Sequence, residues 1–257
     1  SSMTRLFLCR SLTLVIGNIA DNQQHRHHAL QLSLGLDDPI RMEIEGVTIE
    51  AEAILLDAER AHTLGSDEGR KAILLVEAES GIGEALGALC VRDEGFVTFS
   101  SSRFDEFRSS LDSGDDAHRL IEGLLSPLGL NLRSQERTGD LRIRTVLDAI
   151  EGSDEKKLSP SELAKQVGLS ESRLQHLFRQ ETGVSISRYQ LWARMLAAIT
   201  TLSAGVDLTR AAHDAGFADS AHMSRTFRKT FGLAPSEIFK SSSSVQVSFC
   251  PLHYLSE

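Results

Sequence analysis

An internal repeat in the C-terminal half constrains the fold of this chain more than any other feature. Leu163-Ala164-x-x-Val167-Gly168-Leu169 recurs 48 residues later as Ala211-Ala212-x-x-Ala215-Gly216-Phe217, and Leu174-x-x-Leu177-Phe178-Arg179-x-x-x-Gly183 recurs 49 residues later as Met223-x-x-Thr226-Phe227-Arg228-x-x-x-Gly232. Each copy predicts a helix, a glycine turn and a second helix. The glycine ends the first helix in the left-handed region, and an apolar residue follows it. This is the layout of a helix-turn-helix, whose second helix enters the DNA major groove.

The second helix of each copy is expected to have one apolar face and one polar face. Leu174, Leu177 and Phe178 form the predicted buried stripe of the first copy, and Met223, Phe227 and Phe231 form that of the second. The opposite faces carry hydrogen-bonding side chains: Ser172, Arg173, Gln175, His176 and Arg179, then Ser220, His222, Ser224, Arg225, Arg228 and Lys229. Glu181 and Asp219 lie at their margins. Such faces suit contacts to base edges between phosphates.

Between the two copies, residues 186–202 predict one amphipathic helix with Trp192 in its core-facing stripe. A helix of this length is about 25 Å long. It could hold two recognition helices about one turn of DNA apart, near 34 Å. The repeat therefore predicts that one chain contacts two successive major grooves of double-stranded DNA.

The charge is divided unevenly along the chain. The net charge is −9 overall, but residues 1–140 carry −11 and residues 141–257 carry +2. The acidic half should repel DNA phosphates, whereas the second half permits contact.

The first 80 residues predict short strands. Residues 30–36 and 40–45 alternate apolar and polar side chains, and Gly46 separates the second of these from residues 47–50 in a hairpin-like pattern. Residues 12–16, 53–56 and 72–76 add apolar strands, which together predict a small β-barrel or sandwich. Two helical segments follow at 105–111 and 117–125. Their apolar stripe, ending in Leu124, Leu125 and Leu128, either packs on the strands or forms a dimer interface.

The C-terminal half resembles the AraC/XylS transcription regulators over about residues 140–240. The resemblance rests on the repeat above, on Arg194-x-x-x-Ala198-x-x-x-Leu202 and on the closing Gly232-x-Ala234-Pro235. Met223 stands where that family often has an aromatic residue, and Phe239-Lys240 replaces the usual Tyr-Arg. The resemblance implies a bacterial domain of two helix-turn-helix units. It also implies that eight residues of the outer faces meet the grooves: Ser172, Arg173, Gln175, His176, Ser220, His222, Ser224 and Arg225.

In that family the other domain is usually a cupin-like β-barrel that binds an effector or mediates dimerisation. His25-Arg26-His27-x-x-x-Gln31 resembles the cupin His-x-His-x3-Glu element, and His62 falls where a later histidine of that fold would lie. Imidazoles on one strand face suit Zn, Fe, Cu or Ni. The amide of Gln31 replaces the expected carboxylate and weakens the case for a metal. We therefore expect His25, His27, Gln31 and His62 to line an effector or metal pocket, with no resident cofactor.

The expected architecture is α+β with two domains. A cupin-like sensory or dimerisation domain with a helical segment occupies residues 1–131, a linker 132–139, the DNA-binding domain 140–240 and a tail 241–257. Residues 245–249 could add a strand whose neighbour the sequence does not identify. Three widely spaced cysteines and no Cys-x-x-Cys pair predict unpaired thiols.

The sequence thus predicts a DNA-binding transcription regulator that is not an enzyme. It is expected to be cytoplasmic, with no membrane segment and no secretory signal, and to form a homodimer. A small-molecule effector is the expected second partner, and RNA polymerase a third if the protein activates. Two alternatives stay open: a metal-dependent cupin enzyme with a helical appendage, and an adaptor that has lost DNA binding.

Overall fold

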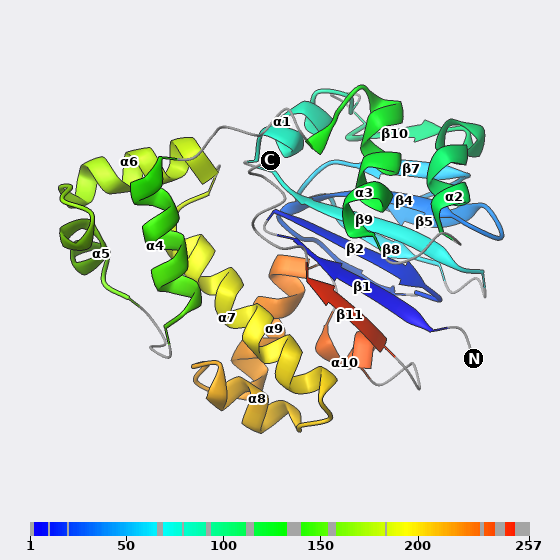
Figure 1. Ribbon diagram of the computed structural model, residues 1–257. Coiled ribbons are helices and arrows are strands. Elements are labelled where there is room, and N and C mark those ends of the chain that lie inside the picture. Colours follow the sequence, from blue (N-terminus) through cyan, green and yellow to red (C-terminus); the bar gives the residue numbers. More distant parts are fainter. Residues whose placement is uncertain are drawn as a thin grey trace. The chain divides into compact units, whose positions relative to one another are not determined.

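The computed structural model describes residues 3–9, 11–19, 21–65, 69–78, 80–90, 94–111, 116–132, 140–153, 158–182, 184–231, 234–239 and 245–249 (Figure 1). These residues form two compact units. One unit contains the described residues up to 132 together with those from 224 to 249, and the other contains those from 140 to 223. Residues 133–139 of the expected linker lie outside the described residues.

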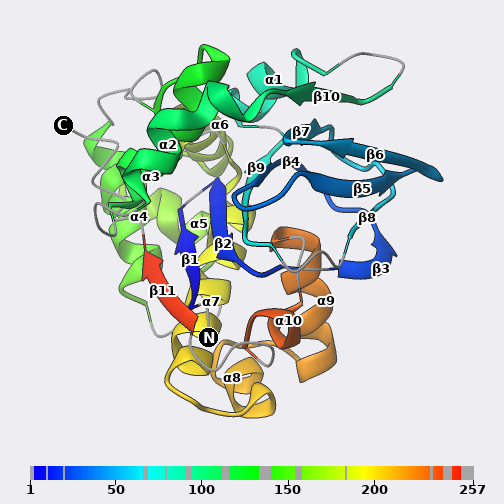
Figure 2. The same ribbon diagram turned by 90° about the vertical axis from the view of Figure 1, so that its right-hand side faces the viewer.

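The strands of the first unit form two sheets (Figures 1 and 2). In chain order they are β1 (Thr4–Leu8), β2 (Leu12–Gly17), β3 (Asp21–His25), β4 (Ala29–Gly35), β5 (Ile40–Ile44), β6 (Val47–Ala51), β7 (Ala53–Leu56), β8 (His62–Leu64), β9 (Lys71–Glu77), β10 (Phe96–Phe99) and β11 (Val245–Phe249). The larger sheet has the order β10-β7-β4-β9-β2-β1-β11, and the smaller has the order β3-β8-β5-β6. The β-rich domain expected from the sequence is confirmed, and its described strands pair as two sheets without closing into one ring.

The side-chain patterns explain which strands lie at the centre. In β5, Ile40, Met42 and Ile44 are buried while Arg41 and Glu43 are exposed, as alternation predicts for a strand with one wet face. Gly46 joins β5 to β6 with φ at +86°, a conformation that glycine adopts without strain. By contrast β2, β4 and β7 are buried at every position, so both faces of these strands are covered, and in β4 this includes the polar Gln31 and Ser33.

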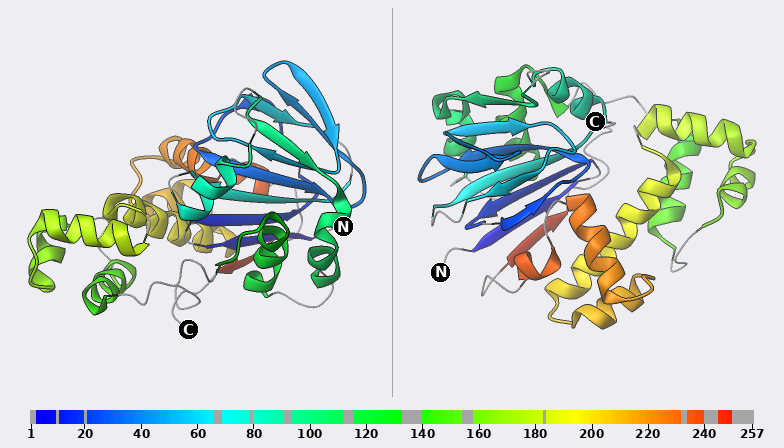
Figure 3. Two further views of the ribbon diagram at one scale, coloured as in Figure 1. Left: turned by 90° about the horizontal axis from the view of Figure 1, so that it is seen from above. Right: turned by 180° about the vertical axis from the view of Figure 1, so that it is seen from behind.

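Up to residue 132, the described part of the first unit also contains the α-helices α1 (Gly81–Gly87), α2 (Asp105–Ser110) and α3 (Ala117–Leu125) (Figure 3). Asp116 caps α3 by accepting from the backbone N–H groups of His118 and Arg119. The apolar stripe of α3 belongs to the same buried cluster as the strand residues Leu14, Leu32 and Leu74. The structure therefore decides between the two sequence interpretations: the stripe packs on the sheet, and it is not an exposed dimer interface.

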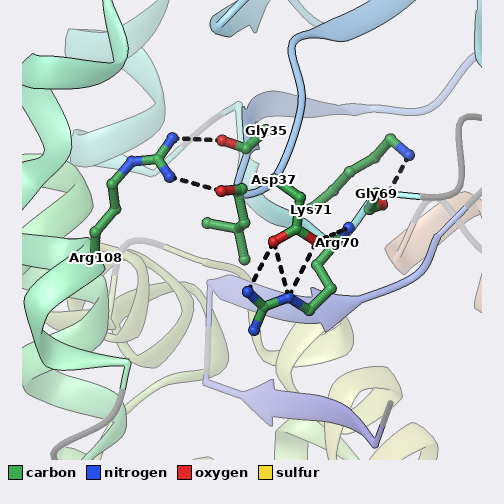
Figure 4. Close-up of polar contacts among 7 residues, drawn as sticks. Gly35, Asp37, Gly69, Arg70, Lys71 and Arg108 are labelled. Atoms are coloured by element: carbon green, nitrogen blue, oxygen red, sulfur yellow. Dashed lines mark hydrogen bonds and ion pairs between the residues drawn. The ribbon is translucent and has the colours of Figure 1, made fainter. Parts of the chain in front are cut away.

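Polar side chains tie α2 to one end of the larger sheet (Figure 4). Arg108 of α2 donates to the carbonyl oxygens of Leu36 and Gly35, at 2.9 and 2.5 Å, where β4 ends. Beside it the guanidinium of Arg70 forms a fork with Asp37, and these hydrogen bonds hold the pKa of the Asp37 carboxyl below its usual value. The two guanidinium groups thus donate to strand-end carbonyls and to the Asp37 carboxylate, which also accepts from the backbone N–H of Arg70.

The strand near the C-terminus extends the larger sheet. β11 pairs in parallel with β1, with Leu6 opposite Val247, which supplies the neighbour that the sequence left open. The expectation of unpaired thiols is wrong for Cys9, which is disulfide-bonded. Cys90 is free and buried, and burial raises the pKa of its thiol to about 11. Distance along the sequence gave no signal for the bond, because chain folding decides which thiols meet.

The C-terminal half is helical as predicted. Its helices are α4 (Leu141–Glu151), α5 (Pro160–Gln166), α6 (Glu171–Thr182), α7 (Ile186–Ser203), α8 (Leu208–Asp214), α9 (Ser220–Phe231) and α10 (Pro235–Phe239). Asp140 caps α4 by accepting from the backbone N–H of Arg142, as its position predicts. Ser159 and Pro160 start α5 at the expected positions, although the Ser159 side chain makes no capping hydrogen bond. No described helix has the length and apolar character that crossing a bilayer requires.

Candidate functional site

The turn between α5 and α6 has the geometry that the first repeat copy predicts. Gly168 adopts a φ of +66°. Its N–H donates to the carbonyl of Lys165 at 3.2 Å, and the N–H of Leu169 donates to that of Ala164 at 2.9 Å. These two bonds satisfy the last carbonyls of α5 in a Schellman motif. Ser170 then caps α6 by accepting from the N–H of Arg173 at 3.3 Å.

The turn between α8 and α9 repeats this geometry 48 residues later. Gly216 has a φ of +78°, its N–H donates to His213 at 3.0 Å, and the N–H of Phe217 donates to Ala212 at 2.9 Å. Asp219 caps α9 by accepting from the N–H of His222 at 2.6 Å. The sequence repeat is therefore also a repeat of hydrogen bonds, and both copies are helix-turn-helix motifs.

Replacing Gly168 by valine is expected to destabilise the helical unit by about 1–2 kcal/mol, the cost of a left-handed conformation for a residue with a Cβ. The position is open, because an added Cβ would meet nothing within 4 Å, so the cost is that of the backbone alone. Gly168→Asn should cost less, since asparagine tolerates this region. Urea unfolding followed by circular dichroism measures both. Equal losses for the two variants would show that backbone strain is not the cause.

The outer face of α6 presents the side chains predicted for the first copy. Leu174, Leu177 and Phe178 are buried, with exposed fractions of 0, 9 and 0%. On the other face all five predicted residues are exposed: Ser172, Arg173, Gln175, His176 and Arg179. The structure thus places them together on one wet face of a single helix.

One residue of this face was missed in the sequence. Glu171 is exposed in the first turn of α6, and its Oε1 accepts from the Nε2 of Gln175 at 3.1 Å. The spacing of four residues between Glu171 and Gln175 is the sequence signal that places both side chains on the same helix face. Together with Glu181, Glu171 balances the charges of Arg173 and Arg179 on α6.

The outer face of α9 has a different charge. Met223 and Phe227 are fully buried, while the side chain of Phe231 lies outside the described residues. The predicted contact residues are exposed at His222, Arg225 and Lys229 and half-buried at Ser220, Ser224 and Arg228. The helix holds three cations and no acidic residue. Its face is therefore the more favourable of the two for phosphate contacts.

The connecting helix α7 holds the second turn through Arg194. The guanidinium donates to the carbonyls of Ala215 and Gly216 at 2.9 and 2.5 Å and lies 4.4 Å over the ring of Phe217. Burial lowers the pKa of Arg194. Trp192 is buried beside Tyr189, with ring centroids 5.6 Å apart, which confirms it as a core residue. Arg194 thus stabilises the turn of the second helix-turn-helix.

The first unit brings the three predicted histidines together. His25 of β3 faces His62 of β8 across the strand pair, with ring centroids 4.3 Å apart. The ring of His27 lies 5.1 Å from that of His62 and 5.6 Å from that of His25. One nitrogen from each ring lies within 4.8 Å of the other two. His27, His62 and Gln31 are buried, and His25 is half-buried.

The hydrogen bonds of the two buried rings fix their tautomers. The Nδ1–H of His62 donates to the carbonyl of Arg60 at 2.9 Å, and that of His27 donates to the carbonyl of Ala29 at 2.8 Å. Burial lowers the pKa of His62 to about 3, and burial also lowers the pKa of His27. Both rings are therefore neutral, and each has a lone pair on Nε2. The Nε2 of His62 is buried without a hydrogen-bond partner among the described residues.

Comparison with known proteins agrees with the geometry of the repeat. Residues 163–241 match the family described as a helix-turn-helix domain. The arabinose operon regulatory protein of Escherichia coli K12 is 38% identical over 76 residues, which are 29% of this chain and 26% of that protein. The transcriptional activator RhaS of Escherichia fergusonii is 32% identical over 142 residues, 53% of this chain and 51% of that protein. This chain thus aligns with about a quarter to a half of these relatives.

Solved structures include ToxT from Vibrio cholerae O395, which aligns at 14% identity over 90% of this chain and 97% of that chain with a TM-score of 0.47. Residues 163–241, which match the helix-turn-helix family, contain both described turns and both second helices. The C-terminal half is therefore a double helix-turn-helix domain of the DNA-binding class. Over this domain the chain is similar to the arabinose operon regulatory protein and to RhaS.

Proposed function

We propose that this protein is a sequence-specific transcription regulator that inserts α6 and α9 into successive major grooves of DNA. The observation that carries the proposal is the repeated turn, identical in its two backbone hydrogen bonds and its glycine conformation. Each copy is followed by a helix whose inner face is apolar and whose outer face is polar. A helix placed in this way after such a turn is the recognition helix of known helix-turn-helix proteins.

The two helices are proposed to divide their roles unequally. With three cations and no carboxylate, α9 supplies most of the phosphate attraction, through Arg228 and Lys229. In α6 the neutral balance favours base reading: Arg173 suits guanine, and Glu171 suits the amino group of cytosine. Ser172, Gln175, His176, Arg179, Ser220, His222 and Ser224 complete the proposed contacts. The DNA-binding domain is proposed to span residues 140–240.

The first domain is proposed to sense an effector or to join two copies of the chain. Relatives named as an operon regulatory protein and a transcriptional activator support a role in controlling transcription, with RNA polymerase as a partner in the case of activation. A homodimer in the cytoplasm is the assembly we propose. The enzyme alternative has less support, because these relatives are named as regulators.

The proposed contacts predict how affinity responds to salt. Five cations lie on the two faces, and the slope of log K against log salt is about −0.9 per neutralised phosphate, so the expected slope is about −2.7 to −4.5 for three to five contacts. Genomic fragments selected by the purified protein should share one sequence motif, and fluorescence anisotropy on that duplex gives the slope. Equal affinity for every duplex would contradict a sequence-specific regulator.

A further inference from the structure

We propose that His25, His27 and His62, together with Gln31, bind one divalent first-row transition metal ion in the N-terminal domain. The inference is independent of DNA binding, because all four residues lie in the β-rich unit. It revises the expectation of no resident metal, which rested on the missing carboxylate.

The first argument is the unsatisfied nitrogen of His62. The side chain is 1% exposed, and its Nε2 has no hydrogen-bond partner among the described residues. Leaving a buried acceptor unpaired is unfavourable, and such a group calls for an explanation. His25 and His27 lie beside this ring, and one ring nitrogen of each of the three histidines lies within 4.8 Å of the others. A cation between them would satisfy Nε2 of His62.

The second argument is the contact between His27 and Gln31. The Nε2 of His27 lies 2.9 Å from the Oε1 of Gln31, yet its Nδ1–H is already donated to Ala29. A neutral ring that donates from Nδ1 has a lone pair on Nε2, and this lone pair faces the Gln31 amide. Two atoms 2.9 Å apart subtend about 90° at a metal 2.05 Å from each, which is the angle between adjacent ligands of an octahedral site. The amide oxygen is therefore positioned as a fourth ligand.

The third argument is the support behind the rings. Histidines that bind metals usually donate the other ring N–H to a carbonyl or carboxylate, which orients the ring. His62 and His27 both do so, to the carbonyls of Arg60 and Ala29. Adjacent ligands at such a site are about 2.9–3.3 Å apart, so ligand atoms now separated by up to 4.8 Å must approach by at most about 1.9 Å. The half-buried His25 is the ring with room to move.

The donor set also indicates which ions would bind. Three imidazoles and one amide oxygen are neutral ligands, which suit Zn²⁺, Ni²⁺, Co²⁺ or Cu²⁺ better than Mg²⁺ or Ca²⁺. The ion would keep its full charge of +2 and have open coordination positions. Water or a small anion would complete the site.

The test uses the full-length protein purified without an affinity tag, stripped with a chelator and titrated with Zn²⁺ and Co²⁺. We expect one equivalent of either ion, visible absorption bands from bound Co²⁺, and a higher melting temperature with metal. His25→Ala should weaken binding at least about 100-fold, since even partners behind the ligands contribute 10- to 100-fold. His62→Leu should have the same effect while filling the site with an apolar side chain.

The matched control is His28→Ala. Its ring contacts Glu59 at 2.9 Å and lies next to the cluster in sequence, so this variant should keep wild-type affinity and spectrum. Circular dichroism confirms that each variant folds. Substoichiometric binding by the wild type would overturn the proposal. Binding that survives His25→Ala but disappears in His213→Ala or His222→Ala would also overturn it, by placing the ion in the helical half.

Discussion

Replacing Arg173 by alanine is expected to weaken binding to the selected DNA site by about 5- to 150-fold, or 1–3 kcal/mol. Arg173 is exposed on α6 in the first two turns after Ser170, where recognition helices contact base edges. Loss of a bidentate contact to guanine should remove preference at that base pair and leave binding to unrelated duplexes nearly unchanged. Anisotropy with the selected site and with single-base variants separates the two cases.

Arg225→Ala makes the corresponding test of α9, and Arg41→Ala is the matched control. Arg41 is an exposed arginine of β5 in the N-terminal sheets, so its removal changes the net charge equally without touching either recognition helix. The control should keep wild-type affinity. Should Arg173→Ala reduce affinity for all duplexes alike, Arg173 would be a phosphate contact, and its proposed role as a base reader would be wrong.

Phe178→Ala is expected to destabilise the helical unit by about 3–5 kcal/mol, the usual cost of removing a buried phenyl ring. Phe178 is fully buried and packs edge-on against Tyr189 of α7, with ring centroids 5.7 Å apart. Because domains are stable by only about 5–15 kcal/mol, this variant should populate unfolded α6 at moderate temperature and lose DNA binding. Thermal unfolding and anisotropy on the same samples measure both effects.

Arg179→Ala, the next residue on the same helix, separates stability from recognition. Its side chain is exposed, and surface substitutions usually change stability by less than about 0.5 kcal/mol. We expect an unchanged melting temperature and weaker DNA binding. If Phe178→Ala kept wild-type stability, the buried stripe assigned to α6 would not form the core of this unit.

The helical half could be predicted in detail because its signals are local. Asp140 and Ser170 cap α4 and α6, and an N-cap depends only on a few adjacent residues. The left-handed glycines and the buried stripes follow in the same way from spacing. Glu171 was not predicted, because the expected outer face consisted of positive and neutral polar side chains. A carboxylate can nevertheless contact a base edge.

The first domain was predicted only in part, because pairing between strands is not local. Alternation identified β4, β5 and the hairpin at Gly46, but β3 and the short β8, which carry His25 and His62, have no such pattern. The apolar stripe of α3 could pack on the sheet or join two chains. The stripe alone does not show which surface covers it, and the structure shows that the sheet does.

The amino-acid sequence by itself determined the two helix-turn-helix motifs, their caps and their exposed faces, because each depends on side chains within about one or two helical turns. Only the tertiary structure decided the order of the strands, the parallel addition of β11 to β1, the bonded state of Cys9 and the distances among the three histidines. Those contacts join residues far apart in the chain. Their geometry follows from how the sheets pack and from the register of β3 against β8.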